Sequence, residues 1–126
     1  MADETVTRTR RYRLDEDGIL RVVALPGSEE TLADAVENLR AASALAQGRK
    51  RPFLVEVETL RSVDREARAY YASRENTKHV SAAAVLVKSP LLRTISNFFL
   101  ALNKPAFPMR LFTSEDEALA WLKSFL

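Results

Sequence analysis

Few side chains in this sequence are of the types that carry out covalent chemistry. The 126 residues include one histidine, His79, and no cysteine. Disulfides, thiolate metal sites and cysteine nucleophiles are therefore excluded. A single histidine also leaves no zinc site of the usual kind, and a serine–histidine–acid triad would need His79 to meet an unidentified serine. We expect His79 to be a cation at a helix end or a surface residue.

Paired carboxylates and glycine-rich loops are the remaining routes to catalysis. Glu56 and Glu58 alternate along a predicted strand and its end, so both could project to one face as an acid–base pair would require, although a charged strand end is far commoner. The three glycines, Gly18, Gly27 and Gly48, are isolated turn residues, and no phosphate loop or dinucleotide fingerprint is present. We therefore predict a protein that is not an enzyme, with no catalytic residue, no metal and no cofactor.

The elements that must position a site follow from the hydrophobic pattern. Residues 52–57 form an almost wholly apolar run, which is typical of a short strand inside a parallel sheet. A loop over Glu58–Ser62 follows, and a helix opens at Val63-Asp64. A strand that passes through a tight loop into a helix start is where an α/β protein usually has its working surface, because helix N-terminal amides point outward there.

The complete pattern is β-β-α-β-α-β-α-β-α. Thr31 with Asp34, and Ser114 with Glu117, are spaced as helix caps, with Ser28 as an alternative first cap. We predict a single α/β domain over residues 7–126 after a flexible tail at residues 1–6. Its sheet would be five-stranded and mostly parallel, with an antiparallel N-terminal edge strand and helices mainly on one face.

The uncovered face of that sheet would mix apolar and charged residues. It is predicted to carry Ile19, Arg21, Val23, Leu54, Glu56, Ala82, Ala84, Leu86 and Arg110. Because this mixture is too apolar for water, we expect something to cover it, and a second copy of the chain is the simplest candidate. The sequence therefore favours a homodimer.

Charge and hydropathy argue against nucleic acid and membrane. The net charge is only +2, with 19 basic and 17 acidic residues interleaved along the chain. Two basic clusters, within residues 8–13 and 49–51, would be the only nucleic-acid footprint, and acidic residues follow the first at once. No apolar run is long enough to span a membrane, and the acidic start is no secretory signal, so we expect a cytoplasmic protein.

The residues around the second helix resemble a known family. Five stretches follow the pattern of small bacterial STAS/SEC14-like proteins. They are Ser62-Val63-Asp64-Arg65-Glu66-Ala67-Arg68-Ala69-Tyr70-Tyr71, Ala84-Val85-Leu86-Val87-Lys88-Ser89-Pro90, Asn97-Phe98-Phe99, Asn103-Lys104-Pro105 and Arg110-Leu111-Phe112-Thr113-Ser114-Glu115-Asp116-Glu117-Ala118. The order of elements is similar to the STAS domain, the SpoIIAA-like fold of anti-sigma-factor antagonists and of sulphate-transporter tails. The resemblance covers nearly the whole chain and implies a regulatory module that binds a protein partner.

The resemblance also implies a phosphorylation switch that this sequence lacks in part. In the antagonists the helix start reads Asp-Ser-Ser-Gly, and a partner kinase phosphorylates the second serine. Asp64 matches the aspartate, but Glu66 stands at the phosphoserine position and Ala67 replaces the glycine. Glu66 is either a mimic of the phosphorylated state or an ordinary first-turn glutamate, and Ser62 is a nearby serine that could be modified.

Two candidate sites result. A partner-binding patch would consist of Arg61, Ser62, Asp64, Arg65 and Glu66. The alternative is a carrier or sensor for a small apolar ligand or lipid, as the SEC14-like label implies, with a pocket between the third helix and the Phe107 loop. That pocket would be lined by Ile95, Phe98, Phe99, Leu102 and Phe107.

Overall fold

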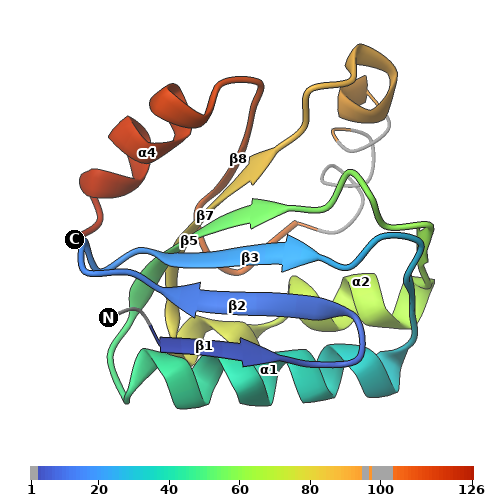
Figure 1. The fold of residues 1–126 in the computed structure, drawn as a ribbon, viewed down its shortest axis with the longest axis horizontal. Coiled ribbons are helices and arrows are strands. Elements are labelled where there is room, and N and C mark those ends of the chain that lie inside the picture. Colours follow the sequence, from blue (N-terminus) through green and yellow to red (C-terminus); the bar gives the residue numbers. More distant parts are fainter. Residues whose placement is uncertain (1–2, 95–96, 98–103) are drawn as a thin grey trace.

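The protein is built on one six-stranded sheet (Figure 1). The computed structural model describes residues 3–94, 97 and 104–126. The strand order is β1-β2-β3-β5-β7-β8, and a separate two-stranded sheet joins β4 and β6. The strands are β1 (Asp3–Val6), β2 (Arg10–Leu14), β3 (Leu20–Ala24), β4 (Glu29–Glu30), β5 (Arg51–Glu56), β6 (Ser62–Val63), β7 (Val80–Leu86) and β8 (Met109–Phe112). The helices are α1 (Leu32–Ala46), α2 (Arg65–Tyr71), η1 (Arg74–Lys78) and α4 (Glu115–Lys123).

The sheet is parallel except at its N-terminal edge. β3, β5, β7 and β8 run parallel, whereas β1 pairs with β2 and β2 with β3 in antiparallel register. This confirms the mixed α/β fold and the mostly parallel sheet, with one strand more than predicted. The tail predicted at residues 1–6 is wrong for Asp3–Val6, because Thr7 closes a turn with Arg10 that folds β1 back onto β2.

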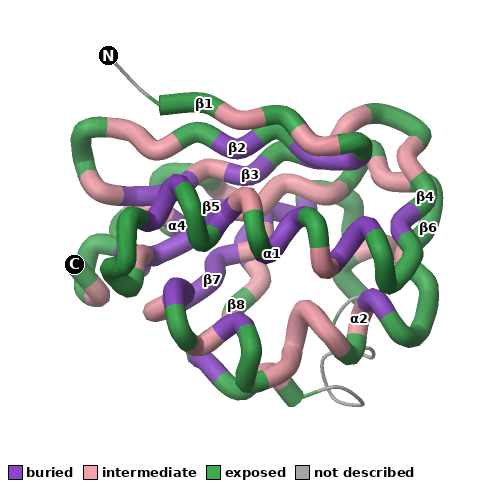
Figure 2. The backbone as a smooth tube through the Cα atoms, turned by 90° about the horizontal axis from the view of Figure 1, so that it is seen from below, coloured by how far each residue is buried: buried purple, intermediate pink, exposed green. Residues whose placement is uncertain are grey.

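Helix α1 covers one face of the sheet, and its start follows the predicted caps. The Thr31 hydroxyl accepts from the Asp34 amide, and the Asp34 carboxylate accepts from the Thr31 amide, so the capping box is complete. The apolar side of α1 packs on β2 and on α2 (Figure 2). Their shared core contains Tyr12, Leu20, Val22, Ala42, Leu45, Phe53, Val80, Ala83 and Phe107.

Helix α4 covers the opposite face, which corrects the prediction made for that face. Leu122 and Ala118 are fully buried against the other side of β5 and β7. The core there contains Ile19, Leu54, Ala82, Ala84, Leu86, Phe112, Ala118 and Leu122. A helix of the same chain thus covers most of the apolar residues for which we expected a second copy, while Val23 stays 40% exposed. The reason given for a homodimer fails, and the oligomeric state itself stays a prediction.

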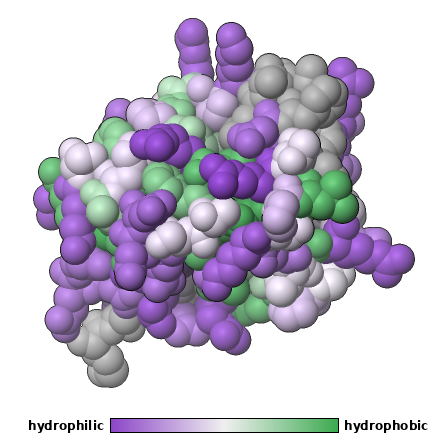
Figure 3. Space-filling view, turned by 90° about the horizontal axis from the view of Figure 1, so that it is seen from above, coloured by the Kyte–Doolittle hydropathy of each residue, from purple (hydrophilic) through white to green (hydrophobic). Residues whose placement is uncertain are grey.

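What remains of that face is polar. Figure 3, seen from the side opposite Figure 2, shows hydrophilic side chains around a smaller hydrophobic area. The charges on the β2–β3 hairpin are paired locally: Arg13 and Arg21 both contact Asp15, and Arg21 also contacts Asp17. Such partly exposed pairs keep a sheet face polar while adding little to stability.

The segment after β5 is shorter in helix than the sequence predicts. The sequence pattern predicts one helix from about Val63 to Lys78, but α2 ends at Tyr71 and a 3₁₀ helix, η1, follows from Arg74 to Lys78. Ala72 and Ser73 separate the two, and the Ser73 amide donates to the Tyr70 carbonyl at 3.1 Å, which closes the last turn of α2. The third predicted helix lies partly outside the described residues. In its described part, residues 90–94 and 97 are helical.

Candidate functional site

The loop after β5 is fastened to the segment after β3. The Thr59 hydroxyl donates to the Ala24 carbonyl at 3.0 Å, and the Gly27 amide donates to the Thr59 carbonyl at 2.8 Å. Beyond the loop, Glu29 and Glu30 pair in parallel with Ser62 and Val63. The two carboxyl ends of β3 and β5 are thereby locked together, at the edge where α/β proteins commonly bind ligands.

The predicted partner-binding patch is exposed. Arg61, Ser62, Asp64, Arg65 and Glu66 all lie on the surface at β6 and the start of α2. Asp64 also stabilises the fold, because it is the N-cap of α2 and its carboxylate accepts a hydrogen bond from the Ala67 amide at 2.9 Å. Arg61 lies 3.5 Å from Glu29, with 75% of its side chain exposed, so this pair is weak and solvated.

The residues that correspond to the phosphorylation switch of the antagonists lie at the start of α2 and in β6. Ala67, where the antagonists carry glycine, is fully buried, whereas Glu66 is exposed in the first turn of α2. Ser62 is exposed and lies in β6, so it does not cap the helix. The hydrogen bond from the Ala67 amide to the Asp64 carboxylate caps the helix. Glu66 and Ser62 take no part in this cap and lie at the surface.

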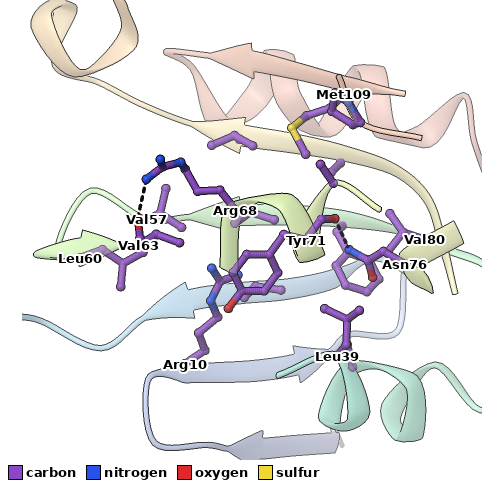
Figure 4. A pocket seen from close by; sticks show the side chains of 18 of the residues that line it. Arg10, Leu39, Val57, Leu60, Val63, Arg68, Tyr71, Asn76, Val80 and Met109 are labelled. Atoms are coloured by element: carbon purple, nitrogen blue, oxygen red, sulfur yellow. Dashed lines mark hydrogen bonds between the residues drawn. The ribbon is translucent and has the colours of Figure 1, made fainter. Parts of the chain in front are cut away.

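A cavity of about 520 Å³ opens beside this patch, between the sheet and α2 (Figure 4). Its exposed rim comes from the loop, with Glu58, Arg61 and Ser62. The walls are mostly apolar. They include Tyr12, Val22, Leu39, Phe53, Val55, Val57, Leu60, Val63, Val80, Ala83, Val85, Phe107, Met109 and Leu111.

Of the five residues predicted to line a pocket, only Phe107 lies within the described part of the chain, so the predicted pocket stays a prediction. Phe107 is 8% exposed and lines the cavity, while Ile95, Phe98, Phe99 and Leu102 lie outside the described residues. Sequence reasoning missed the walls contributed by β2, β3, β5 and α1, because in a sequence these residues read only as core. It also missed the polar residues Arg10, Arg68, Tyr71 and Asn76.

A buried polar cluster closes the cavity on the side of β2. The Arg10 guanidinium donates to both carboxylate oxygens of Glu30, at 2.8 and 2.7 Å, and lies 4.3 Å from the centre of the Tyr71 ring. Tyr71 donates to Glu30 at 3.0 Å, and Asn38 donates to Tyr71 at 2.9 Å. Thr9 completes the set by donating to Glu30 at 2.7 Å.

The ionisation of this cluster is fixed by its hydrogen bonds. Burial by itself lowers the pKa of Arg10, but the bond to Glu30 outweighs it, so the pKa of Arg10 is raised. Burial likewise raises the pKa of Glu30, yet the bonds from Arg10, Thr9 and Tyr71 carry it below its usual value. Burial raises the pKa of the Tyr71 phenol. On the side of β2, the cavity is therefore bounded by a neutralised ion pair.

Two further candidates from the sequence are placed elsewhere. His79 is 6% exposed at the end of η1, so the expected surface position is wrong, and burial lowers its pKa. The Glu58 carboxylate accepts from the backbone amides of Lys88 and Ser89 and ties the loop to the end of β7. Glu56 is half-buried on β5.

Within the described parts of the chain, two absences are worth recording. No group of three or more histidine, cysteine, aspartate and glutamate side chains is arranged to hold a metal ion. None of the helices described is long and apolar enough to cross a membrane.

Comparison with known proteins places the chain in a family. The model of the domain of unknown function DUF7793 matches residues 12–126. The chain belongs to the DUF7793 family. No curated protein matches it.

Solved structures show how the DUF7793 chain is folded. It is similar to a protein from Shewanella loihica PV-4 of the DUF3478 family, described as having a SpoIIAA-like fold, with 15% identity, a TM-score of 0.57, and 97% of this chain and 92% of that chain covered. An anti-sigma factor antagonist from Mycobacterium paratuberculosis is 13% identical at a TM-score of 0.52, with 98% and 95% covered. A protein of unknown function from Arthrobacter sp. FB24 is 36% identical, with 88% and 96% covered and a TM-score of 0.36. The first two confirm the SpoIIAA-like fold predicted from the sequence.

Proposed function

We propose that this chain is a non-catalytic, cytoplasmic regulatory module that binds a protein partner through the patch Arg61, Ser62, Asp64, Arg65 and Glu66. The observation that carries the proposal is the exposure of all five residues on one rigid corner, where the loop is tied to β4 and α2 is capped. A surface that is already ordered loses little conformational entropy when it binds.

The charges of the patch favour a specific partner rather than a generic polyanion. Arg61 and Arg65 alternate with Asp64 and Glu66, so the patch has no net charge. Mixed patches of this kind discriminate among partners by charge register, because a wrong partner meets like charges. The antagonist from Mycobacterium paratuberculosis shares the fold, which supports a regulatory role without showing it.

The proposed module works without the usual phosphoacceptor. Glu66 stands where the resemblance places the phosphoserine, and its carboxylate is exposed in the first turn of a helix, where a negative charge is favourable. On this proposal the partner meets a permanent negative charge, and binding needs no kinase. Ser62 remains an exposed hydroxyl on the same corner.

Site-specific photo-crosslinking in cells that make the protein tests this proposal. A photoreactive phenylalanine analogue in place of Arg65 should yield a discrete adduct with one protein. The same analogue in place of Arg49, an exposed residue in the turn after α1, serves as the control. The proposal fails if position 65 gives no adduct, or gives the same adducts as position 49.

A second candidate function is the binding of a small apolar ligand as a carrier or sensor. The observation that favours it is the cavity of about 520 Å³, since sites for small molecules usually measure about 300–1,000 Å³. The two candidates are compatible, because Arg61 and Ser62 belong to both the patch and the rim of the cavity.

A further inference from the structure

We infer that the cavity takes an uncharged, largely apolar ligand with one hydroxyl or N–H group, and that this group donates a hydrogen bond to Oδ1 of Asn76. The inference deepens the ligand-binding role given above as the second candidate and rests on it. It adds the chemical class of the ligand, its orientation and the residue that recognises it.

Among the described residues that line the cavity, Asn76 carries a buried acceptor atom without a hydrogen-bond partner. Its side-chain nitrogen donates to the Tyr71 carbonyl at 3.0 Å, which fixes the orientation of the amide. Its oxygen, Oδ1, is buried without a hydrogen-bond partner in the described part of the chain, and the residue is only 8% exposed. Asn76 lines the cavity, beside Val80 in Figure 4. A buried acceptor left unsatisfied costs about 1–3 kcal/mol, so a ligand that supplies a donor has a clear advantage.

The other polar groups of the cavity wall have partners within the protein. The Arg10 guanidinium is held by Glu30, and the Tyr71 hydroxyl lies between Glu30 and Asn38. Arg68 donates to the Val63 carbonyl at 2.6 Å, near the loop. Arg68 and the charged rim lie toward the loop, so at the opposite end of the cavity the ligand meets the Asn76 acceptor among apolar side chains, and that acceptor selects for a donor.

The shape of the cavity sets the orientation of the ligand. Val57, Leu60 and Val63 stand at the loop, at the carboxyl ends of the strands, whereas Val80 and Asn76 lie at the opposite end, where β7 begins (Figure 4). The exposed rim is at the loop. The ligand thus enters from the loop with its donor group leading, and its apolar body lies along β5 and β7.

Charge excludes the two common ionised groups from the inner end. A carboxylate has no proton to donate and would place a second acceptor against Asn76 Oδ1. An ammonium group would lose its hydration without a counter-charge, because the nearby Glu30 is already paired with Arg10. An alcohol, phenol or indole-type N–H on an apolar body meets both requirements.

Three matched probes test this inference: 4-butylphenol, 4-butylanisole and 4-butylbenzoate, titrated into the full chain and followed by amide NMR shifts. The first two differ only in the donor. We expect 4-butylphenol to bind about fivefold more tightly than 4-butylanisole, as one added hydrogen bond gives, and 4-butylbenzoate to bind most weakly. The largest shifts should fall on cavity residues such as Val80 and Ala83.

Two variants locate the effect. Asn76→Leu should abolish the preference for phenol over anisole, whereas Ser81→Ala, which removes another buried and unpartnered oxygen outside the cavity lining, should keep it. Equal affinity of the phenol and the anisole for the wild-type protein overturns the role of Asn76 even if Asn76→Leu does not fold. Failure of all three probes to bind overturns the cavity as a ligand site, and neither result touches the partner-binding patch.

Discussion

At the scale of single residues, one buried polar cluster holds β2, β4, α1 and α2 together. It consists of Thr9, Arg10, Glu30, Asn38 and Tyr71. Glu30 has a fully buried side chain and accepts hydrogen bonds from four of its neighbours. The cluster joins β2, β4, α1 and α2, which are the elements around the patch and the cavity. Removing one partner of such a pair leaves a buried charge uncompensated.

We predict that Glu30→Gln lowers the free energy of unfolding by about 3 kcal/mol, because the Arg10 charge then stays buried without its counter-ion. Urea denaturation measures the change. The neighbouring Glu29→Gln is the matched control: its side chain is 65% exposed in a weak pair with Arg61, so less than about 0.5 kcal/mol should be lost. If Glu30→Gln lowers the free energy of unfolding by less than about 1 kcal/mol, the cluster does not stabilise the fold as proposed.

A second prediction at this scale concerns pH. Burial lowers the pKa of His79 in the folded protein, so the unfolded chain binds its proton more readily. Stability should therefore fall as the pH drops below about 6.5, the ordinary histidine value. Because His79 is the only histidine, NMR titration of its ring reports the folded pKa without overlap. A His79→Leu variant should lose the pH dependence between pH 7 and 5, and a ring that titrates at or above 6.5 would refute the prediction.

At the scale of elements, α4 is the helix whose position matters most for the molecule as a whole. Ser114 caps it through the Glu117 amide, and three acidic residues occupy its first turn, as the sequence indicates. The sequence pattern could not predict on which face of the sheet α4 packs, since an amphipathic helix fits either face. The mixed composition of the second face showed that a cover was needed, but not that the cover came from the same chain.

We predict that Leu122→Ala destabilises the protein by about 3 kcal/mol, since Leu122 is fully buried between α4 and the sheet. Thermal or urea unfolding gives the value. Leu126→Ala, at a residue that is 66% exposed just beyond α4, should change the stability by less than about 0.5 kcal/mol. Equal effects of the two variants would mean that α4 does not pack on this face.

At the scale of the whole molecule, the sequence predicted the order of the elements and the SpoIIAA-like fold well. The caps Thr31 with Asp34 and Ser114 with Glu117 are signalled locally and were found as predicted. β1 was missed because Asp3, Glu4 and Val6 are exposed and carry no alternating pattern. The β4–β6 pair was missed because two residues give no periodicity, and only the folded chain brings them together.

Of the candidate site, one part could be predicted from the sequence and the other could not. The exposed patch was predictable because a loop before a helix start is a local feature. The cavity was not, because its walls come from β2, β3, β5, β7, β8 and α1, and only the fold turns these core residues into a lining. Asn76 gave no signal either, since an unpartnered oxygen is a property of packing.

The central claim is that the charged corner binds a protein partner, and a charge swap tests it most directly. The dissociation constant of the partner found by crosslinking should be measured for the wild-type protein and for the double variant Arg65→Glu, Glu66→Arg. A second double variant, Glu37→Arg, Arg40→Glu, makes the same swap on the exposed side of α1. We predict that the patch swap weakens binding at least 100-fold and that the α1 swap changes it less than twofold, because reversed charges meet like charges at a specific interface. Unchanged affinity after the patch swap, or an equal loss for both variants, would contradict the claim.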